Sequence, residues 1–396
     1  MKDMNKWTIY VIALGVFLTA TSELVVSGIL RVLAKDLNIS IAFAGQLITA
    51  YSLAFAIGTP ILVSLTSRLG RRKVLLGAMA AFIMGCLLSF WSLDISTLIA
   101  SRIILGVSSG VYIVAAFGAA AKIVPPEKIG SAISTIVLGF SSAMILGVPI
   151  GISITNWLNW QAIFLILALM SLLVTFVIFR LLPEIEGDAP TSFRQQFKVL
   201  GSAVIVSGLF LTFFRESGNS VLFTYLTPFM QDILQLKASN ISIVMLVFGI
   251  FGAVGTRFGG YGIDRWGAAR IIAFSTIVHV VVLALLPLFA GSTLIGLLLI
   301  SIMMVSLFMA GPATQTYFIQ QEPQSSSLVL SLNTSIIHLG LATGAGAGGA
   351  MISANSTVLY NPWMASFIIV LALLSAFISF SMGKKRLSNL QKRLTL

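Results

Sequence analysis

The chain has 396 residues, of which 58% are hydrophobic and only 9% are charged. Soluble globular domains carry about 25% charged residues, so this composition excludes an ordinary soluble enzyme, a disordered chain and a nucleic-acid-binding domain. The single cysteine excludes a disulfide framework and any multi-cysteine metal site. We interpret the net charge of +12 as basic loops facing the cytoplasm.

A membrane-crossing helix needs about 20 mostly apolar residues. The sequence predicts an all-α integral membrane protein with twelve such helices, arranged as two pseudo-symmetric six-helix bundles. The predicted spans are 7–30, 42–65, 74–91, 96–121, 130–153, 161–182, 204–230, 240–260, 270–290, 293–317, 328–353 and 362–382. The predicted domains are an N-terminal bundle (1–182), a cytoplasmic linker (183–199) and a C-terminal bundle with a short basic tail (200–396).

The basic residues predict the orientation of the spans. With both termini in the cytoplasm, most of the 24 Lys and Arg residues fall on the cytoplasmic side, as the positive-inside rule requires. Arg31, Lys35 and Lys237 fall outside, and Arg102 and Arg215 fall within spans. We therefore expect a multi-pass protein of the bacterial inner membrane.

An internal repeat supports the two bundles. A shift of 197 residues places Arg68-Leu69-Gly70 on Arg265-Trp266-Gly267. The same shift places Pro126 on Pro323, Gly147 on Gly344 and Gly151 on Gly348. Two halves of the same topology can rock against each other around a central site, which gives alternating access.

Four motifs punctuate the spans. Ser67–Lys73 and Gly260–Arg270 resemble a G-x-x-x-D-R-x-G-R-R motif, and the first copy lacks its acidic residue because Ser67 stands there. The fourth span carries Arg102-x-x-x-Gly106, and the fifth carries Gly147-Val-Pro149-Ile-Gly151. Trp160-Gln161-x-x-Phe164 resembles W-R-x-x-F.

These motifs resemble the major facilitator superfamily, and within it the twelve-helix drug:proton antiporter family and its arabinose-efflux-like, purine-efflux subgroup. The resemblance implies proton-coupled export of a small amphipathic molecule (a drug, a nucleobase, a nucleoside or an analogue). We expect a monomer, because no exposed helix carries a compelling dimer motif. It implies no catalytic residue and no cofactor, with the proton gradient as the energy source. A sugar or metabolite uptake symporter or uniporter of the same fold stays open, as does a channel or an intramembrane enzyme.

Four charges lie within the predicted spans: Glu23, Arg102, Arg215 and Glu216. Charges at this depth are costly and indicate function. Glu23 lies about 10 Å before the expected helix end at Leu30, and Arg102 about 8 Å into its helix, so we expect similar depths. We predict proton coupling through Glu23, Arg102 and Glu216, with a static buried ion pair as the alternative. Arg215 and Glu216 should diverge by about 100° and not share a partner.

Two further groups of residues are candidates. The expected substrate cavity contains polar and aromatic side chains within the spans: Glu23, Tyr112, Arg215, Asn219, Tyr225, Asn333 and His338. The expected gating residues are Gly70, Arg71, Gly147, Pro149, Gly151, Gly260, Asp264, Arg265 and Arg270. Asp264 and Arg265 would form part of a cytoplasmic latch, with Asp264 favoured by the positive end of a helix dipole. His279 is interpreted as structural, and two separate histidines predict no metal site.

Overall fold

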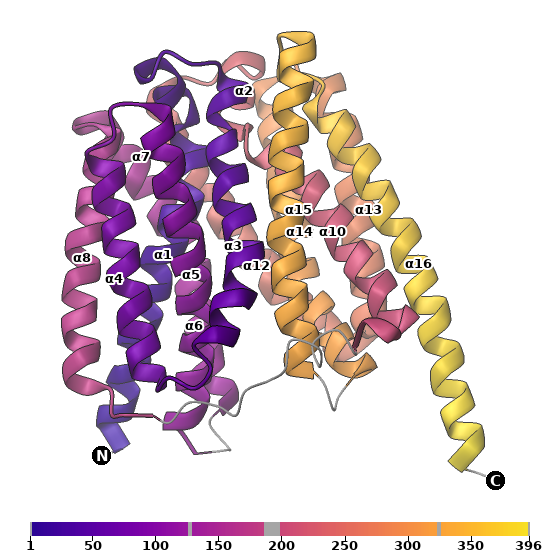
Figure 1. Ribbon diagram of the computed structural model, residues 1–396. Coiled ribbons are helices and arrows are strands. Elements are labelled where there is room, and N and C mark those ends of the chain that lie inside the picture. Colours follow the sequence, from indigo (N-terminus) through magenta and orange to yellow (C-terminus); the bar gives the residue numbers. More distant parts are fainter. Residues whose placement is uncertain (1, 126–128, 186–198, 323–325, 395–396) are drawn as a thin grey trace. The chain divides into compact units, whose positions relative to one another are not determined.

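The computed structural model describes residues 2–125, 129–185, 199–322 and 326–394. The secondary structure of these residues is entirely helical (Figure 1). The chain divides into two compact units. The first contains Met1–Thr191, Thr224–Gln231 and Leu236–Gly249, and the second contains Ser192–Phe223, Asp232–Gln235 and Ile250–Leu396. The central part of the predicted linker lies outside the described residues.

Long helices that run side by side dominate the N-terminal half of the chain (Figure 1). In chain order they are α1 (Lys2–Asp36), α2 (Ile41–Ala44), α3 (Gln46–Leu65), α4 (Arg71–Phe90), α5 (Ile95–Ile123), α6 (Ile129–Ser142), the π-helical turn η2 (Ala143–Gly147), α7 (Val148–Trp157) and α8 (Trp160–Leu181). Side-chain caps begin α5 and α8, where Asp94 accepts from Thr97 N and Asn159 accepts from Ala162 N. Such caps satisfy amide groups that have no partner inside the helix.

The C-terminal half repeats this pattern with different interruptions. Its elements are η3 (Val199–Gly201), α10 (Ala203–Phe223), α11 (Leu226–Pro228), η4 (Phe229–Ile233), η5 (Ala238–Asn240), α12 (Ile241–Trp266), α13 (Ala268–Leu285), η6 (Leu286–Phe289), α14 (Thr293–Gln321), α15 (Ser326–Asn355) and α16 (Asn361–Leu394). Within the second unit, α10 packs closely against α15 and α16. The predicted span 204–230 is therefore a helix that breaks after Phe223.

Eleven helices in the described part of the chain are long and apolar enough to cross a membrane. The predicted span that is missing from these eleven is the seventh, 204–230, which contains α10. The second half of α10 carries Arg215, Glu216 and Asn219, which lower its hydropathy. These three side chains are buried, so α10 hides its polar groups inside its unit.

The first span extends beyond the predicted end at Leu30. It runs from Trp7 to Asp36, so Glu23 lies about 20 Å from the helix end instead of about 10 Å. The predicted end of this helix at Leu30 is therefore six residues too early. The helix continues because Asp36 is held there by the Trp160 indole, whose Nε1 donates to Oδ2 at 2.7 Å.

Close helix contacts repeat at nearly the 197-residue offset. A Cβ at Gly147 would lie 2.2 Å from Thr21 Oγ1 on α1, and a Cβ at Gly344 would lie 2.0 Å from the Ser217 backbone oxygen on α10. In each case a glycine allows two helices of one unit to approach closely. Thr21 and Ser217 differ by one residue from the offset that relates the two glycines, so the internal repeat extends to helix packing.

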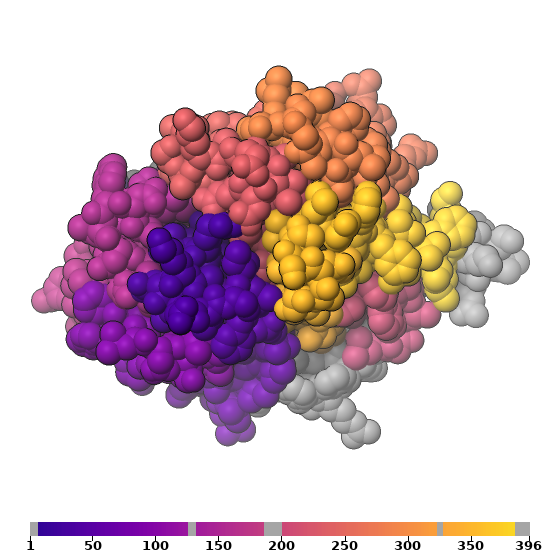
Figure 2. Space-filling model, turned by 90° about the horizontal axis from the view of Figure 1, so that it is seen from above, coloured from indigo at the N-terminus to yellow at the C-terminus, as the bar shows by residue number. Residues whose placement is uncertain are grey.

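The ends of the helices are joined by short connections. Figure 2 looks down on one such end, where the segment around α2, in indigo, lies on the surface of its unit. The connection between α12 and α13 is a single residue, Gly267, which has φ of 86°. Residues that carry a side chain rarely adopt this left-handed backbone conformation, so glycine is required there.

Candidate functional site

The Arg102 guanidinium is buried in the first unit, where it joins three helices. Its Nη1 donates to the backbone oxygen of Ser22 on α1 at 3.0 Å, and its Nη2 donates to Ser89 Oγ on α4 at 3.3 Å. The Phe164 ring of α8 lies under the guanidinium, with 4.6 Å between the guanidinium carbon and the ring centroid. The R-x-x-x-G and W-Q-x-x-F motifs therefore meet at one cation–π contact.

Glu23 follows directly after the residue that binds Arg102. Its side chain is half-buried, whereas Tyr51, on α3, is fully buried nearby. The Tyr51 side chain is close enough to interact electrostatically with both Glu23 and Arg102. The structure thus places the predicted residue Arg102 against the turn of α1 that carries Glu23, with Tyr51 near both.

Tyr112 has a different position from the one its cavity assignment implies. It is fully buried between α5 and α1, and its hydroxyl donates to the Ile12 backbone oxygen at 3.1 Å. The same hydroxyl fills the space beside Gly15, where a Cβ would lie 2.0 Å from it. Tyr112 therefore packs two helices together.

The second unit contains an ion pair formed by neighbouring residues. Arg215 Nε donates to Glu216 Oε1 at 3.1 Å, and Nη2 of the same guanidinium also donates to that oxygen. Nη1 donates to Thr314 Oγ1 of α14 at 3.0 Å. The two side chains were not expected to face one partner, and here they pair with each other, because both are long enough to bend from the helix and meet.

The ion pair belongs to a polar stripe on α10. Thr212, Arg215, Glu216 and Asn219 recur at helical spacing and are all buried. Thr212 Oγ1 donates to Asn333 Oδ1 of α15 at 2.8 Å. Asn219 Oδ1 is buried and has no hydrogen-bond partner among the described residues. The stripe thus combines a paired charge with an available hydrogen-bond acceptor.

Two buried histidines lie on other helices of the second unit. His338 is buried on α15, and its Nδ1 lies 3.0 Å from the Thr334 oxygen one turn earlier. His279 is buried on α13 and interacts electrostatically with Arg215. The interpretation of His279 as a structural residue stays a prediction.

The glycines of the fifth span fit against α1 in a constant register. A Cβ added at Gly139 would lie 2.3 Å from Ala13 O. One at Gly147 would lie 2.2 Å from Thr21 Oγ1, and one at Gly151 would lie 2.3 Å from Val25 Cγ2. Pro149 follows a π-helical turn at the start of α7. These residues thus hold the helix beside Glu23.

Tyr225 lies at the break between α10 and α11 and is fully buried. A Cβ at Gly45 would lie 2.0 Å from its hydroxyl oxygen. Both residues belong to the first unit. Tyr225 therefore packs against the start of α3, a contact that its sequence position does not indicate.

The first basic motif is held by surrounding backbone. Arg71 N donates to the Ile185 oxygen at 2.9 Å, and a Cβ at Gly70 would lie 2.9 Å from that oxygen. Arg72 donates to the Phe179 oxygen and lies over the Phe179 ring at 4.9 Å. The start of α4 is thus tied to the chain that follows α8.

The second copy is not the expected loop, because Gly260, Asp264 and Arg265 lie in the final turns of α12. Asp264 is exposed near the C-terminal end of that helix, where the helix dipole disfavours a carboxylate. The predicted dipole stabilisation of Asp264 is therefore wrong. Arg265 Nη1 donates to Tyr261 Oη at 2.8 Å, and Arg270 is exposed on α13.

Sequence reasoning missed the neutral partners of the buried charges. Ser89 and Thr314 bind the two guanidinium groups, and Asn361 Nδ2 donates to the Val221 oxygen at 2.9 Å. Serine and threonine are common in membrane helices, so their residue type alone gives no signal. Ser89 Oγ also donates to Ser101 Oγ of α5 at 2.8 Å. Helices α4 and α5 therefore share a polar contact.

Each unit thus contains a carboxyl and a guanidinium within its helices, and charges in such positions are functional candidates. No group of three or more His, Cys, Asp or Glu side chains that could hold a metal ion occurs in the described part of the chain. Helices long enough to cross a membrane, in two repeated sets with charges inside each, are the architecture of a membrane transporter.

The chain belongs to the Major Facilitator Superfamily, whose model matches residues 12–345 and 208–391. It is 37% identical over 382 residues to the MFS-type transporter YbcL of Bacillus subtilis (strain 168), covering 96% of this chain and 98% of that protein. It is 29% identical over 368 residues to the inner membrane transport protein YdhP of Escherichia coli (strain K12), covering 93% and 94% of the two chains.

A solved structure shares the fold. The crystal structure of a D-xylose–proton symporter matches with a TM-score of 0.78 at 18% sequence identity, covering 95% of this chain and 97% of that chain. The family and the fold predicted from the motifs are confirmed. Transporters of this family generally need no cofactor.

Proposed function

We propose that this transporter is a proton-coupled exporter of small amphipathic molecules. The observation that carries the proposal is the half-buried Glu23 carboxyl, which follows directly after the carbonyl that holds Arg102. A membrane-embedded carboxyl is costly to keep charged, and a nearby guanidinium lowers that cost. A small change in their separation would therefore change how readily Glu23 takes up a proton.

The proposed cycle uses this balance. When the site faces the side of higher proton concentration, Glu23 binds a proton and loses its charge. When it faces the cytoplasm, the proton leaves and the substrate takes its place. Each ligand thus favours the access state that it binds more tightly, which is the requirement for coupling.

The Arg215–Glu216 pair is proposed as a second coupling element. Protonation of Glu216 would remove the charge that holds Arg215 and free the guanidinium to bind an anionic or carbonyl-bearing substrate. Further hydrogen-bonding groups are buried on α10 (Asn219) and on α15 (Asn333 and His338). These groups suit a planar polar molecule such as a nucleobase, a nucleoside or an analogue, and drugs of similar size remain candidates.

Gating would involve the basic motifs. Gly70 and Arg71 couple the start of α4 to the chain after α8, while Asp264, Arg265 and Arg270 are exposed around the α12–α13 connection. We propose that these exposed charges pair differently in the two access states. The first copy would contribute less, because Ser67 replaces its acidic residue.

The proposed location is the bacterial inner membrane, with both termini in the cytoplasm. The excess of basic residues on one side supports this orientation, and YdhP is itself named an inner membrane transport protein. We propose a monomer. Uptake by symport is the second candidate, since a D-xylose–proton symporter shares the fold.

Everted membrane vesicles with an imposed pH gradient test the proposal. Accumulation of a purine nucleobase, a quinolone, chloramphenicol and a pentose is measured for the wild type, Glu23→Gln and Glu216→Gln. We expect gradient-driven accumulation of at least one non-sugar compound, lost in Glu23→Gln. Lys384→Gln, at an exposed position on α16, is the matched control. Unchanged accumulation in Glu23→Gln would reject the carrier role, and gradient-driven movement in the opposite direction would favour uptake.

A further inference from the structure

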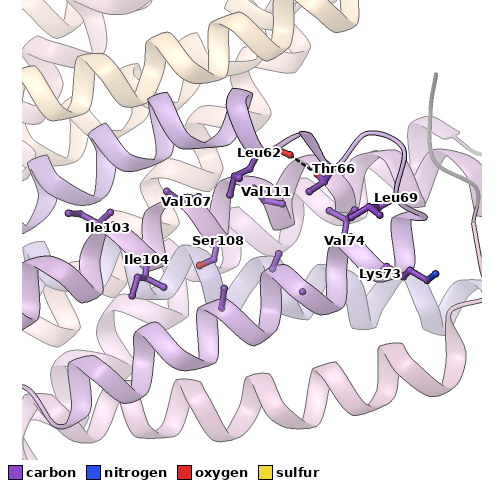
Figure 3. A pocket seen from close by; sticks show the side chains of 13 residues that line it. Leu62, Thr66, Leu69, Lys73, Val74, Ile103, Ile104, Val107, Ser108 and Val111 are labelled. Carbon is purple, nitrogen blue, oxygen red and sulfur yellow. Dashed lines mark hydrogen bonds between the residues drawn. The ribbon is translucent and has the colours of Figure 1, made fainter. Parts of the chain in front are cut away.

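An apolar groove of about 430 Å³ opens on the first unit between α3, α4 and α5 (Figure 3). Its walls come from the last turns of α3, the first half of α4 and the middle of α5. The lining residues are Leu62, Thr66, Leu69, Lys73, Val74, Gly77, Ala78, Ala81, Ile103, Ile104, Val107, Ser108 and Val111. None of the charged residues assigned above to proton coupling lines it.

The groove wall presents hydrocarbon even where it contains hydroxyl groups. Thr66 Oγ1 donates to Leu62 O at 2.6 Å, and Ser108 Oγ donates to Leu105 O at 3.1 Å. Each hydroxyl is therefore satisfied by its own helix and needs no polar ligand. The groove is suited to an apolar chain.

Gly77 leaves part of the groove open. A Cβ at Gly77 would meet no atom within 4 Å, unlike the glycines that separate closely packed helices. Gly77, Leu69 and Ile103 are exposed at the surface of the unit. The groove is therefore reached from the surface, which lies in the bilayer for a protein of this class. Such a surface is in contact with lipid tails.

The groove has a positive charge at one end. Figure 3 shows the Lys73 side chain at that end, beyond Val74 and Leu69. Lys73 is exposed, and the described residues provide it with no hydrogen-bond or ion-pair partner. Its neighbour Arg72 is bound to Phe179, so Lys73 is left to interact with a ligand. The acidic residue that the motif would supply is absent, because position 67 is serine.

We propose that this groove binds one acyl chain of an anionic phospholipid, whose phosphate pairs with Lys73. An apolar slot with a single cation at its end matches a molecule with a hydrocarbon chain and a negative head group. From Lys73 to Ala81 the groove extends about 12 Å along α4, which accommodates much of an acyl chain. Basic pockets between membrane helices on the cytoplasmic side attract anionic head groups in this way. The proposal goes beyond transport and does not depend on its direction.

Photolabelling in lipid nanodiscs tests this site. The full-length protein is exposed to phosphatidylglycerol with a diazirine in the acyl chain, and labelled peptides are identified by mass spectrometry. A phosphatidylcholine analogue with the same chain controls for head-group charge. We expect labels from phosphatidylglycerol on residues 74–81 and 103–111, and much less labelling there by phosphatidylcholine.

Three variants separate charge from space. Lys73→Gln should lower labelling by phosphatidylglycerol about five-fold, as expected for one lysine at an anionic lipid surface, and Lys73→Arg should retain it. Gly77→Leu should fill the groove and abolish labelling there. Ala80→Leu, on the same helix but not in the groove, and Lys384→Gln are the matched controls.

The outcomes are distinct. Equal labelling by the two lipids, or no effect of either Lys73→Gln or Gly77→Leu, would overturn the proposal. Displacement of the label by a purine nucleoside or chloramphenicol would assign the groove to a transported molecule and would also overturn it. If Gly77→Leu reduces thermal stability, Ala81→Phe provides a second way to fill the groove.

Discussion

Arg102 of α5 donates a hydrogen bond to the backbone oxygen of Ser22, the residue that precedes Glu23 on α1. The guanidinium is therefore fixed to the backbone of the helix that carries the carboxyl. Its second donor binds Ser89, and its face packs on Phe164. Movement of α1 relative to α5 must break this bond or move the charge together with Glu23.

Arg102→Lys should weaken the first unit although it preserves the charge. A lysine cannot bind Ser22 and Ser89 with a planar fork while it stacks on Phe164. Loss of one hydrogen bond from a charged group corresponds to about 1.5–3 kcal/mol. Thermal unfolding of the purified protein in detergent measures this loss. A Tm equal to that of the wild type would show that the fork contributes nothing.

The Arg215–Glu216 pair should show strong non-additivity. Arg215→Met leaves a buried carboxylate without its partner, for which we expect a loss of about 3–5 kcal/mol. The double variant Arg215→Met/Glu216→Gln removes both charges, so its loss should be smaller than that of Arg215→Met alone. Chemical unfolding of the two single variants and the double variant completes the cycle. Additive losses would contradict a direct pair.

At the two repeated glycine contacts, a second substitution should restore lost stability at one site and not at the other. Gly147→Ala places a methyl group against Thr21 Oγ1, and Gly344→Ala places one against the Ser217 backbone oxygen. Overpacking of this kind costs about 1–3 kcal/mol. Thr21→Ala should restore stability to Gly147→Ala, whereas Ser217→Ala should not restore it to Gly344→Ala. Thermal stability and transport of the four variants provide the measurement, and equal rescue at both sites would contradict the contacts.

We expect Asp94, which precedes the first residue of α5, to make a pH-dependent contribution to stability. The Thr97 backbone amide and the Thr97 hydroxyl hold the pKa of the Asp94 carboxyl below its usual value. A lowered folded-state pKa means that the stabilisation is present above the unfolded pKa and is lost as pH falls through the folded pKa.

Thermal unfolding between pH 7 and pH 3 measures this contribution. Asp94→Ala should lower the Tm at pH 7 and reduce the difference between the two pH values. Asp94→Asn should keep part of the cap without titrating. A pH dependence identical to that of the wild type in both variants would exclude the carboxyl as its source.

Cysteine labelling tests the orientation. In a Cys86→Ser background, which removes the single buried thiol, Lys237→Cys should react with a membrane-impermeant maleimide in intact cells. Arg68→Cys should react only in everted vesicles, because the basic motif is placed in the cytoplasm. The reverse pattern would invert the proposed topology.

The sequence was sufficient for the family and for the main helices, because apolar length and basic connections are one-dimensional signals. Helix ends were less accessible. The continuation of α1 to Asp36 depends on a bond from Trp160, far along the chain. Asp264 was likewise expected in a loop, but it lies in α12, because the connection to α13 is the single residue Gly267.

The pairing of buried side chains was the least predictable feature. Helix geometry alone separates Arg215 from Glu216, but their long side chains meet. Thr314 and Ser89 became recognisable as partners only once their helices were in place. Glu23 and Arg102 were predictable because a charge in an apolar span is conspicuous by itself.

The constant register between α1 and the fifth span limits how the transporter can move. A residue on α6, η2 or α7 faces the α1 residue 126 positions earlier, as Gly139, Gly147 and Gly151 face Ala13, Thr21 and Val25. A slide of one helical turn in one direction would bring Ala143 to Thr21, and in the other direction Thr155 to Val25. Both encounters replace a glycine with a larger side chain. These contacts therefore oppose sliding of α1 along the fifth span, and we expect the two to move together as one rigid body.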